Sequence, residues 1–318
     1  MASVTGIPMV DLSLFTTTDA TKQQDFVNQL GKAFVDVGFV AVINHGISQE
    51  LVKQFYEASY QFFSLPATTK AKYEIPGLAG QRGYTSFGKE HAKHSKVGDL
   101  KEFFQIGQTI PPSAAINIIY PDNVSVDEIP ALFNVGNQLY KAFEVTGNHL
   151  LEAIALFLNL NRNYFNAPCL YGNSILRAIH YPPITQEPAS AIRAEQHEDI
   201  NLITLLVGAS ADGLQVLSKN NNWVDVRATG DAIVVNVGDM LQRLTNNYLK
   251  STTHRVVNPP RDLWHTPRLS IPFFLHPQST MPLNCLAQCI TPEAPLAYSP
   301  ITAGEYLDER LREIGLKK

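Results

Sequence analysis

The sequence predicts a mainly β protein of the α+β class, with a double-stranded β-helix (jelly roll) as its core. Helical periodicity dominates the first third of the chain, whereas short apolar runs between turn signals fill the last half. Seven or eight such runs suit two antiparallel sheets rolled against each other, and the mouth of such a roll can hold a metal away from bulk water. We therefore expect a helical N-terminal region and bracing helices around a jelly-roll core.

Length and composition favour a single domain over residues 1–318. A chain of 318 residues can bury about three quarters of its unfolded surface. Hydrophobic residues make up 45% of the sequence, and no repeat or low-complexity linker interrupts it. We expect an N-terminal helical and strand cap over residues 1–120 and the jelly-roll core over 170–280.

Three helices are predicted. A helix over 21–37 ends at Gly38, a second follows Ser48 as its N-cap and runs from 49 to about 64, and a third covers about 130–158 and braces the barrel from outside. The first is indicated by apolar residues at three- and four-residue steps, which are Phe26, Val27, Leu30, Phe34 and Val37.

The predicted strands are short apolar runs. One of them, FVAVI, precedes the second helix, and the others are ILRAIHY, NLITLLVGA, GLQVLS, WVDVR, AIVVNVG, THRVV and RLSIPFFLH. Turn-forming residues at Asp212-Gly213 and from Asn220 to Asn222 predict hairpins between them.

Composition argues against several partners and compartments. The formal charge is -4 and no basic block is present, so a nucleic-acid-binding surface lacks its electrostatic signature. The N-terminus has no signal-peptide pattern, and no apolar run approaches the length of a membrane span. Cys169, Cys285 and Cys289 form no disulfide framework, so we expect reduced thiols in a cytoplasmic protein.

Two histidines and one carboxylate predict a metal site. His197 and Asp199 stand at positions i and i+2 of QHEDINLITLL, and on a strand they would share one face while Glu198 turns away. His254, 55 residues after Asp199, would supply the third ligand from a distant strand. Two nitrogens and one carboxylate oxygen leave open positions on an octahedral Fe(II), as in non-haem oxygenases. Zinc hydrolases use similar ligands.

A second pair of residues favours iron over zinc. Arg268 and Ser270 also stand at i and i+2, so a guanidinium fork and a hydroxyl can converge on one carboxylate. A 2-oxo acid that chelates the metal would need such an anchor for its far carboxylate. The two patterns together predict an Fe(II) site with a 2-oxo acid cosubstrate.

An ordered set of motifs extends this hypothesis to a family. These motifs are IPMVDLSLF, GFVAVINHGI, FFSLPATTKAKY, RGYTSFG, DLKEFFQIG, HYPP, QHEDINLITLL, DGLQVL, WVDV, VVNVGDMLQRLTNNYLKSTTHRVV and RLSIPFF. With them the chain resembles the isopenicillin N synthase-like family of Fe(II)/2-oxoglutarate-dependent oxygenases over almost its whole length. The resemblance implies Fe(II), 2-oxoglutarate and O2 as cofactor and cosubstrates.

The resemblance also implies roles for individual residues. It places the iron ligands on His197, Asp199 and His254, and the carboxylate anchor on Arg268 and Ser270. Tyr181 of HYPP matches a tyrosine that contacts the oxo acid or the substrate carboxylate in the family. Arg82 and Tyr84 of QRGYTSF lie in a segment that borders the substrate, so we expect them to reach over the mouth and recognise a polar group.

Some positions depart from the family's pattern. Ile179 stands where plant-type members have an asparagine, and the C-terminal REIGLKK lacks the glutamine that closes the resting iron site of the penicillin-ring cyclase. No match appears for the characteristic lysine of the ethylene-forming members.

Three functions follow as hypotheses. The first is a dioxygenase that hydroxylates or desaturates a small molecule and releases succinate and CO2. The second is an isopenicillin N synthase-like oxidative cyclase or oxidase, in which Arg268 and Ser270 hold the substrate and no 2-oxoglutarate is used. The third is a noncatalytic jelly-roll binding protein with a structural metal. For the first we expect a monomer with a small-molecule substrate and neither a nucleic-acid nor a membrane partner.

Overall fold

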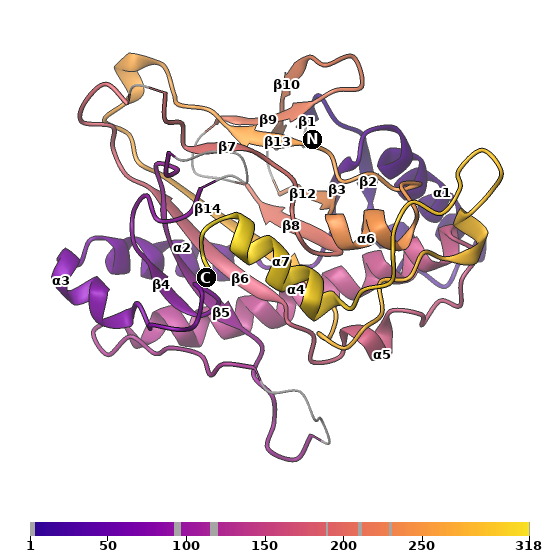
Figure 1. Ribbon diagram of the computed structural model, residues 1–318, viewed down its shortest axis with the longest axis horizontal. Helices are drawn as coiled ribbons and strands as arrows, with labels where there is room; N and C mark the ends of the chain where they lie inside the picture. The colour runs from indigo at the N-terminus through magenta and orange to yellow at the C-terminus, as the bar shows by residue number, and fades with distance from the viewer. Residues whose placement is uncertain are drawn as a thin grey trace.

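The structure, a computed structural model, describes residues 4–91, 97–114, 120–188, 190–208, 212–228 and 231–317. Its main element is an eight-stranded sheet with the order β2-β3-β12-β8-β14-β6-β5-β4, shown in Figure 1. All neighbours in it are antiparallel except β2 and β3. The strands are β2 (Met9–Asp11), β3 (Phe39–Ile43), β4 (Gly83–Thr85), β5 (Glu102–Gly107), β6 (Ile175–Tyr181), β8 (Ile203–Val207), β12 (Ile233–Val237) and β14 (Arg268–Leu275).

A smaller sheet has four strands in the order β10-β9-β13-β7. These are β7 (Ala194–His197), β9 (Leu214–Leu217), β10 (Trp223–Asp225) and β13 (His254–Val256). A two-stranded ribbon pairs β1 (Val4–Thr5) with β11 (Arg227–Ala228). The two larger sheets, which belong to the jelly-roll core of this fold, confirm the predicted class.

Three long helices pack together beside the large sheet, and α4 contacts four of its strands (Figure 1). They are α1 (Ala20–Asp36), α2 (Gln49–Phe63) and α4 (Pro130–Phe157), which confirms all three predicted helices to within a residue or two. The predicted N-cap is also confirmed, because the Ser48 hydroxyl accepts a hydrogen bond from the Leu51 amide. Gly38 follows α1 with φ +76°, where Thr252 and the Lys250 carbonyl leave no room for a Cβ.

Side chains alternate strictly along the central strands of the large sheet. On β14, Leu269, Ile271 and Phe273 pack into the hydrophobic core with the helices, while Arg268 and Ser270 line a cavity on the opposite face. The side chains of strand β6 alternate in the same way. Leu176 and Ala178 pack into the hydrophobic core, and the residues that line the cavity are Ile175, Arg177, Ile179 and Tyr181. The two-residue period therefore separates the hydrophobic core from the site.

Several elements differ from the prediction. Strands β4 and β5 and the C-terminal helix α7 (Ala303–Glu313) were not expected. Asn220 to Asn222 join the antiparallel pair β9 and β10, as predicted, but the hairpin expected at Asp212-Gly213 is wrong, because β8 and β9 belong to different sheets. The remaining helices are α3 (Ala67–Lys70), α5 (Asn166–Cys169), α6 (Asp239–Leu244), η1 (Leu12–Leu14), η2 (Ala71–Tyr73), η3 (Arg261–Leu263) and η4 (Ala287–Cys289). Among the described residues no helix has the length and apolarity needed to span a membrane.

Candidate active site

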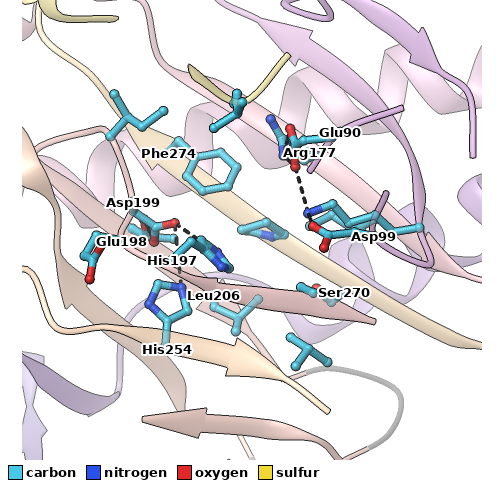
Figure 2. Close-up of a pocket in the computed structure, with 18 of the residues that line it drawn as sticks. Glu90, Asp99, Arg177, His197, Glu198, Asp199, Leu206, His254, Ser270 and Phe274 are labelled. Carbon is cyan, nitrogen blue, oxygen red and sulfur yellow. Dashed lines mark hydrogen bonds and ion pairs between the residues drawn. The ribbon is translucent and has the colours of Figure 1, made fainter. Parts of the chain in front are cut away.

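Two histidines and one aspartate meet between the sheets. The Nε2 atoms of His197 and His254 lie 3.9 and 3.7 Å from Oδ1 of Asp199, and one candidate ligand atom from each residue falls within 4.8 Å of the others. His197 and His254 are directly opposite each other on the paired strands β7 and β13. Figure 2 shows the three side chains pointing toward one another.

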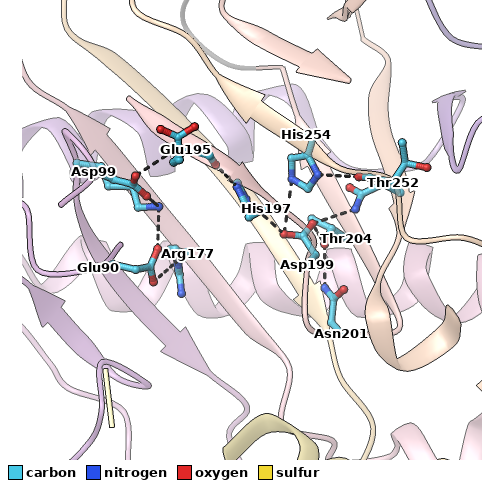
Figure 3. Close-up of polar contacts among 12 residues, drawn as sticks. Glu90, Asp99, Arg177, Glu195, His197, Asp199, Asn201, Thr204, Thr252 and His254 are labelled. Carbon is cyan, nitrogen blue, oxygen red and sulfur yellow. Dashed lines mark hydrogen bonds and ion pairs between the residues drawn. The ribbon is translucent and has the colours of Figure 1, made fainter. Parts of the chain in front are cut away.

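Each member of this group is oriented by its neighbours (Figure 3). Nδ1 of His197 lies 2.6 Å from the Glu195 carbonyl, and Nδ1 of His254 lies 3.1 Å from the Thr252 carbonyl. A carbonyl only accepts, so both Nδ1 atoms carry the proton and both Nε2 lone pairs are left for a metal. The chemistry of these three donors therefore fits a divalent metal ion.

Asp199 reaches the site in a way that the sequence did not suggest. The expected strand through QHEDINLITLL does not exist, because β7 ends at His197 and β8 begins at Ile203 in the other sheet. Asp199 lies in the connection that crosses between the sheets. Its Oδ2 accepts hydrogen bonds from Thr204 Oγ1 at 2.7 Å and Asn236 Nδ2 at 2.9 Å, which hold the carboxylate in place of a strand.

Burial and charge keep His197 and Asp199 in protonation states that suit metal binding. Burial, followed by the nearby His254, lowers the pKa of His197 and favours the neutral ring. Burial alone would raise the pKa of Asp199, but the two histidines and the hydrogen bonds from Thr204 and Asn236 lower it on balance. Both shifts favour forms that donate electron pairs to a cation.

Arg268, Ser270 and Tyr181 come together as the sequence predicted. Arg268 and Tyr181 are cross-strand neighbours on β14 and β6, and the guanidinium carbon lies 5.0 Å from the centre of the Tyr181 ring. All three side chains are buried and line the same cavity as the metal-binding group. Ile179, at the position where plant-type relatives have asparagine, lies directly opposite Ser270 and also faces the cavity.

The cavity has a volume of about 460 Å³. Apolar residues from both sheets cover much of its wall, and Leu307, Leu311 and Ile314 from α7 and its end close one side. A cavity of this size, mostly apolar with a few placed polar groups, is typical of a small-molecule site.

A group of charged side chains forms another side of the cavity, and we call Glu90, Asp99, Lys101 and Arg177 the polar wall. Figure 2 labels Glu90, Asp99 and Arg177. Lys101 Nζ lies 2.7 Å from Glu90 Oε1 and 2.8 Å from Asp99 Oδ2. Arg177 Nη1 lies 3.3 Å from Glu90 Oε2. Burial alone would raise the pKa of Glu90, but Lys101 and Arg177 lower it to about 2. None of these residues was identified from the sequence.

Arg82 and Tyr84 do not lie where we expected. Neither lines the cavity. Arg82 is only 1% exposed and donates to Gln108 Oε1 at 2.8 Å, while the Tyr84 hydroxyl donates to buried Glu102. The expectation that they reach over the mouth is therefore wrong, and in the structure they brace β4 against β5.

Comparisons with known proteins identify the family. A family model described as "non-haem dioxygenase in morphine synthesis N-terminal" matches residues 7–128, and one described as "2OG-Fe(II) oxygenase superfamily" matches residues 172–277. The second match includes His197, Asp199 and His254, which we call the metal-binding group, as well as Arg268 and Ser270, which we call the anchor pair.

Individual proteins that are similar to this chain point to the same family. The chain is 30% identical to a "2-oxoglutarate-Fe(II) type oxidoreductase" of Metarhizium rileyi, over 95% of this chain and 89% of the relative. A putative 2OG-Fe(II) oxygenase of Caulobacter crescentus is 41% identical with a TM-score of 0.86, covering 97% and 99% of the two chains. A Neurospora crassa protein crystallised with alpha-KG (2-oxoglutarate) and thymine is 29% identical with a TM-score of 0.84, covering 96% of each. The chain therefore belongs to the 2OG-Fe(II) oxygenase superfamily, in its isopenicillin N synthase-like branch, and is an enzyme that uses Fe(II), 2-oxoglutarate and O2.

Proposed function

We propose that His197, Asp199 and His254 are the three protein ligands of Fe(II). The observation that supports this most directly is the convergence of two Nε2 atoms and one carboxylate oxygen within 4.8 Å. Both histidines have Nδ1 occupied by a backbone carbonyl, which presets the coordinating tautomer. Three ligands on one face leave positions for 2-oxoglutarate and O2.

For the cosubstrate, we propose that Arg268 and Ser270 bind the far carboxylate of 2-oxoglutarate and that Tyr181 positions it. Arg268 offers a planar fork of donors that matches a carboxylate. It is 2% exposed, so the ion pair would form away from water, where it is least screened. The Tyr181 ring lies against the guanidinium and restricts its orientation.

The reaction that we propose is hydroxylation or desaturation of a small molecule. Fe(II) supplies the oxygen activation, while the protein supplies orientation and a cavity that excludes water. In hydroxylation, one O2 atom enters the product and the other enters succinate as 2-oxoglutarate loses CO2. In desaturation, two hydrogens leave the substrate and one water forms instead.

The oxidative cyclase hypothesis has less support. In it, Arg268 and Ser270 would hold the primary substrate, and 2-oxoglutarate would not be consumed. Relatives named as 2-oxoglutarate enzymes, and similar structures that hold alpha-KG, favour the dioxygenase. A noncatalytic jelly roll has no observation in its favour, because the metal-binding group opens onto a cavity instead of being enclosed.

Succinate release tests the proposed function. The enzyme with Fe(II), ascorbate and 2-oxoglutarate would be incubated in air with thymine, the first compound to test because a similar structure holds it. We expect succinate and CO2 in equal amounts, together with a product heavier by one oxygen or lighter by two hydrogens when the compound is a substrate. Oxygen uptake that depends on an added compound but not on 2-oxoglutarate would instead favour the cyclase.

We further propose that residues 1–318 form one catalytic domain and that the enzyme is a cytoplasmic monomer. All three cysteines are free, which suits a reducing compartment. Strands β2 and β3 at one edge of the large sheet, and β4 and β5 at the other, come from the N-terminal part and continue the same sheet. Light scattering during gel filtration would test the monomer.

A further inference from the structure

Arg177 is held rigidly in the polar wall. Its guanidinium carbon lies 4.1 Å from the centre of the Phe103 ring and 5.1 Å from that of Phe274, so aromatic rings contact it from two strands. Nε donates to Gln105 Oε1 at 2.8 Å, and Nη1 contacts Glu90. A donor fixed in this way loses little conformational entropy when a ligand binds.

At one end of this guanidinium the described residues provide no hydrogen-bond partner. In the part of the chain that the structure describes, Nη2 of Arg177 makes no hydrogen bond, although the side chain is only 13% exposed and lines the cavity. His276, which also lines the cavity, has a buried Nδ1 to which none of the described residues is hydrogen-bonded. Burial lowers the pKa of His276 to about 3, so its ring is neutral. Buried hydrogen-bonding atoms without partners, such as His276 Nδ1, are uncommon and call for a ligand or water, and Nη2 of Arg177 is left to bind the same ligand.

The charge of the cavity disfavours an anion at these atoms. Among the described residues, seven carboxylates and four lysine or arginine side chains line the cavity. One Fe(II) and one 2-oxoglutarate dianion would add equal and opposite charges, so the excess of carboxylates would remain. Within the polar wall the two cations are already paired with two carboxylates. A further carboxylate at Nη2 of Arg177 would lie beside Glu90 and be repelled by it, whereas an uncharged carbonyl can accept from Nη2 without this repulsion.

We propose that the primary substrate is a small molecule without net negative charge, and that Arg177 recognises it through an uncharged acceptor, an amide, imide or similar carbonyl. His276 supplies a second, neutral hydrogen bond. This inference rests on the proposed function, because it assumes that 2-oxoglutarate is held by Arg268 and not by Arg177.

Matched uncharged and anionic probes test the proposal without any variant. Binding of thymine and 5-carboxyuracil, and of benzamide and benzoate, would be measured by titration calorimetry on the full chain loaded with Mn(II) and 2-oxoglutarate, near neutral pH. We expect the uncharged member of each pair to bind at least about tenfold more tightly, because the acid would place a second carboxylate beside Glu90 and like charges repel. Tighter binding of the acids, or no binding of any probe, would overturn the proposal.

Variants then assign the selectivity to residues. Arg177→Gln should weaken binding of the uncharged probes at least about tenfold. The matched control is Arg162→Gln, which changes an Arg–Glu pair with Glu152 of α4 and should leave probe binding unchanged. Glu90→Gln removes the carboxylate next to Arg177 and should reduce the ratio by which the uncharged probes bind more tightly than the acids.

Unchanged probe affinity in folded Arg177→Gln would contradict the role of Arg177. A wild-type protein that fails to bind 2-oxoglutarate would refute the proposed function, whereas normal 2-oxoglutarate binding with a preference for acids would refute only this inference.

Discussion

The metal-binding group and the polar wall line one cavity, and they are built differently. His197 and His254 face each other across a pair of hydrogen-bonded strands, and Asp199 is held by two hydrogen bonds. The three metal-binding residues therefore depend on one strand pair and on one connection between the sheets. The polar wall instead brings Glu90, Asp99 and Lys101 from irregular segments against Arg177 of β6.

This difference separates shared chemistry from individual specificity. The two histidines and the anchor pair lie on strands of the two sheets, and Asp199 lies in the short connection between them. The polar wall depends on the connections before β5, and loops on a rigid scaffold are where specificity usually resides. Changes at the metal end should therefore remove all turnover, whereas changes at the polar wall should redirect which molecule is bound.

The largest effect is expected from the metal ligands. His254→Ala should lose measurable succinate formation and bound iron while the protein stays folded, because the two remaining ligands cannot restore the geometry. Iron content and succinate would be measured on the same sample, with circular dichroism to check the fold. His265→Ala, which removes an exposed histidine that does not line the cavity, is the matched control and should keep its iron. Wild-type turnover in His254→Ala would show that the ligand set is wrong.

The next largest effect is expected from the anchor pair, Arg268 and Ser270. Arg268→Ala should weaken 2-oxoglutarate binding by about 2–5 kcal/mol, the usual result of truncating one partner of a buried charged pair, and Ser270→Ala by only about 0.5–1.5 kcal/mol. Arg268→Lys should restore part of the loss, because an ammonium cannot bind bidentately. The 2-oxoglutarate Michaelis constant measures all three. An unchanged constant in Arg268→Ala, with weaker binding of the primary substrate, would support the cyclase instead.

A smaller effect is expected from the groups that orient Asp199. Asn236→Ala removes one of the two hydrogen bonds to Oδ2 and should lower metal affinity about 10–100-fold. Competition with a chelator would measure it. Asn201→Ala, which leaves both of these bonds in place, should have a weaker effect. Equal losses in the two variants would mean that Asn236 acts only through folding.

The polar wall should affect turnover least, and its contribution should be seen in how the stability of the fold depends on pH. The pKa of Glu90 falls from an ordinary 4.5 to about 2 in the folded protein, so its ionised form stabilises the fold above about pH 4.5, and that contribution is lost as pH falls toward 2. Glu90→Gln should cost roughly 3–5 kcal/mol near neutral pH, because it leaves Lys101 and Arg177 underpaired.

Urea unfolding at several pH values tests this sign. The difference between wild type and Glu90→Gln should shrink as pH falls from about 4.5 toward 2. Glu152→Gln, at the more exposed pair with Arg162, should cost less than about 1 kcal/mol throughout. A constant difference for Glu90→Gln across this range would mean that its charge does not stabilise the fold.

Residues on the long strands and helices were mostly placed correctly from the sequence, whereas residues in irregular connections were mostly not. The spacing of Arg268 and Ser270 placed them correctly because β14 is a continuous strand. The same argument placed Asp199 near His197 for the wrong reason, since no strand runs between them. Helix α7 was overlooked although Thr302 and Glu305 form a capping box that is visible in the sequence. Lys101 and Arg177 had no such signal, because only tertiary contacts distinguish them from surface residues.

Anaerobic visible spectroscopy tests the central claim most directly. Fe(II) added to the protein with 2-oxoglutarate should produce the weak charge-transfer band of a bidentate 2-oxo acid on iron. The band should be absent in His254→Ala and should need far more 2-oxoglutarate in Arg268→Ala, whereas Arg177→Gln should form it at wild-type 2-oxoglutarate concentrations. No band in the wild-type protein, or a normal band in His254→Ala, would contradict the assignment of the metal and cosubstrate sites.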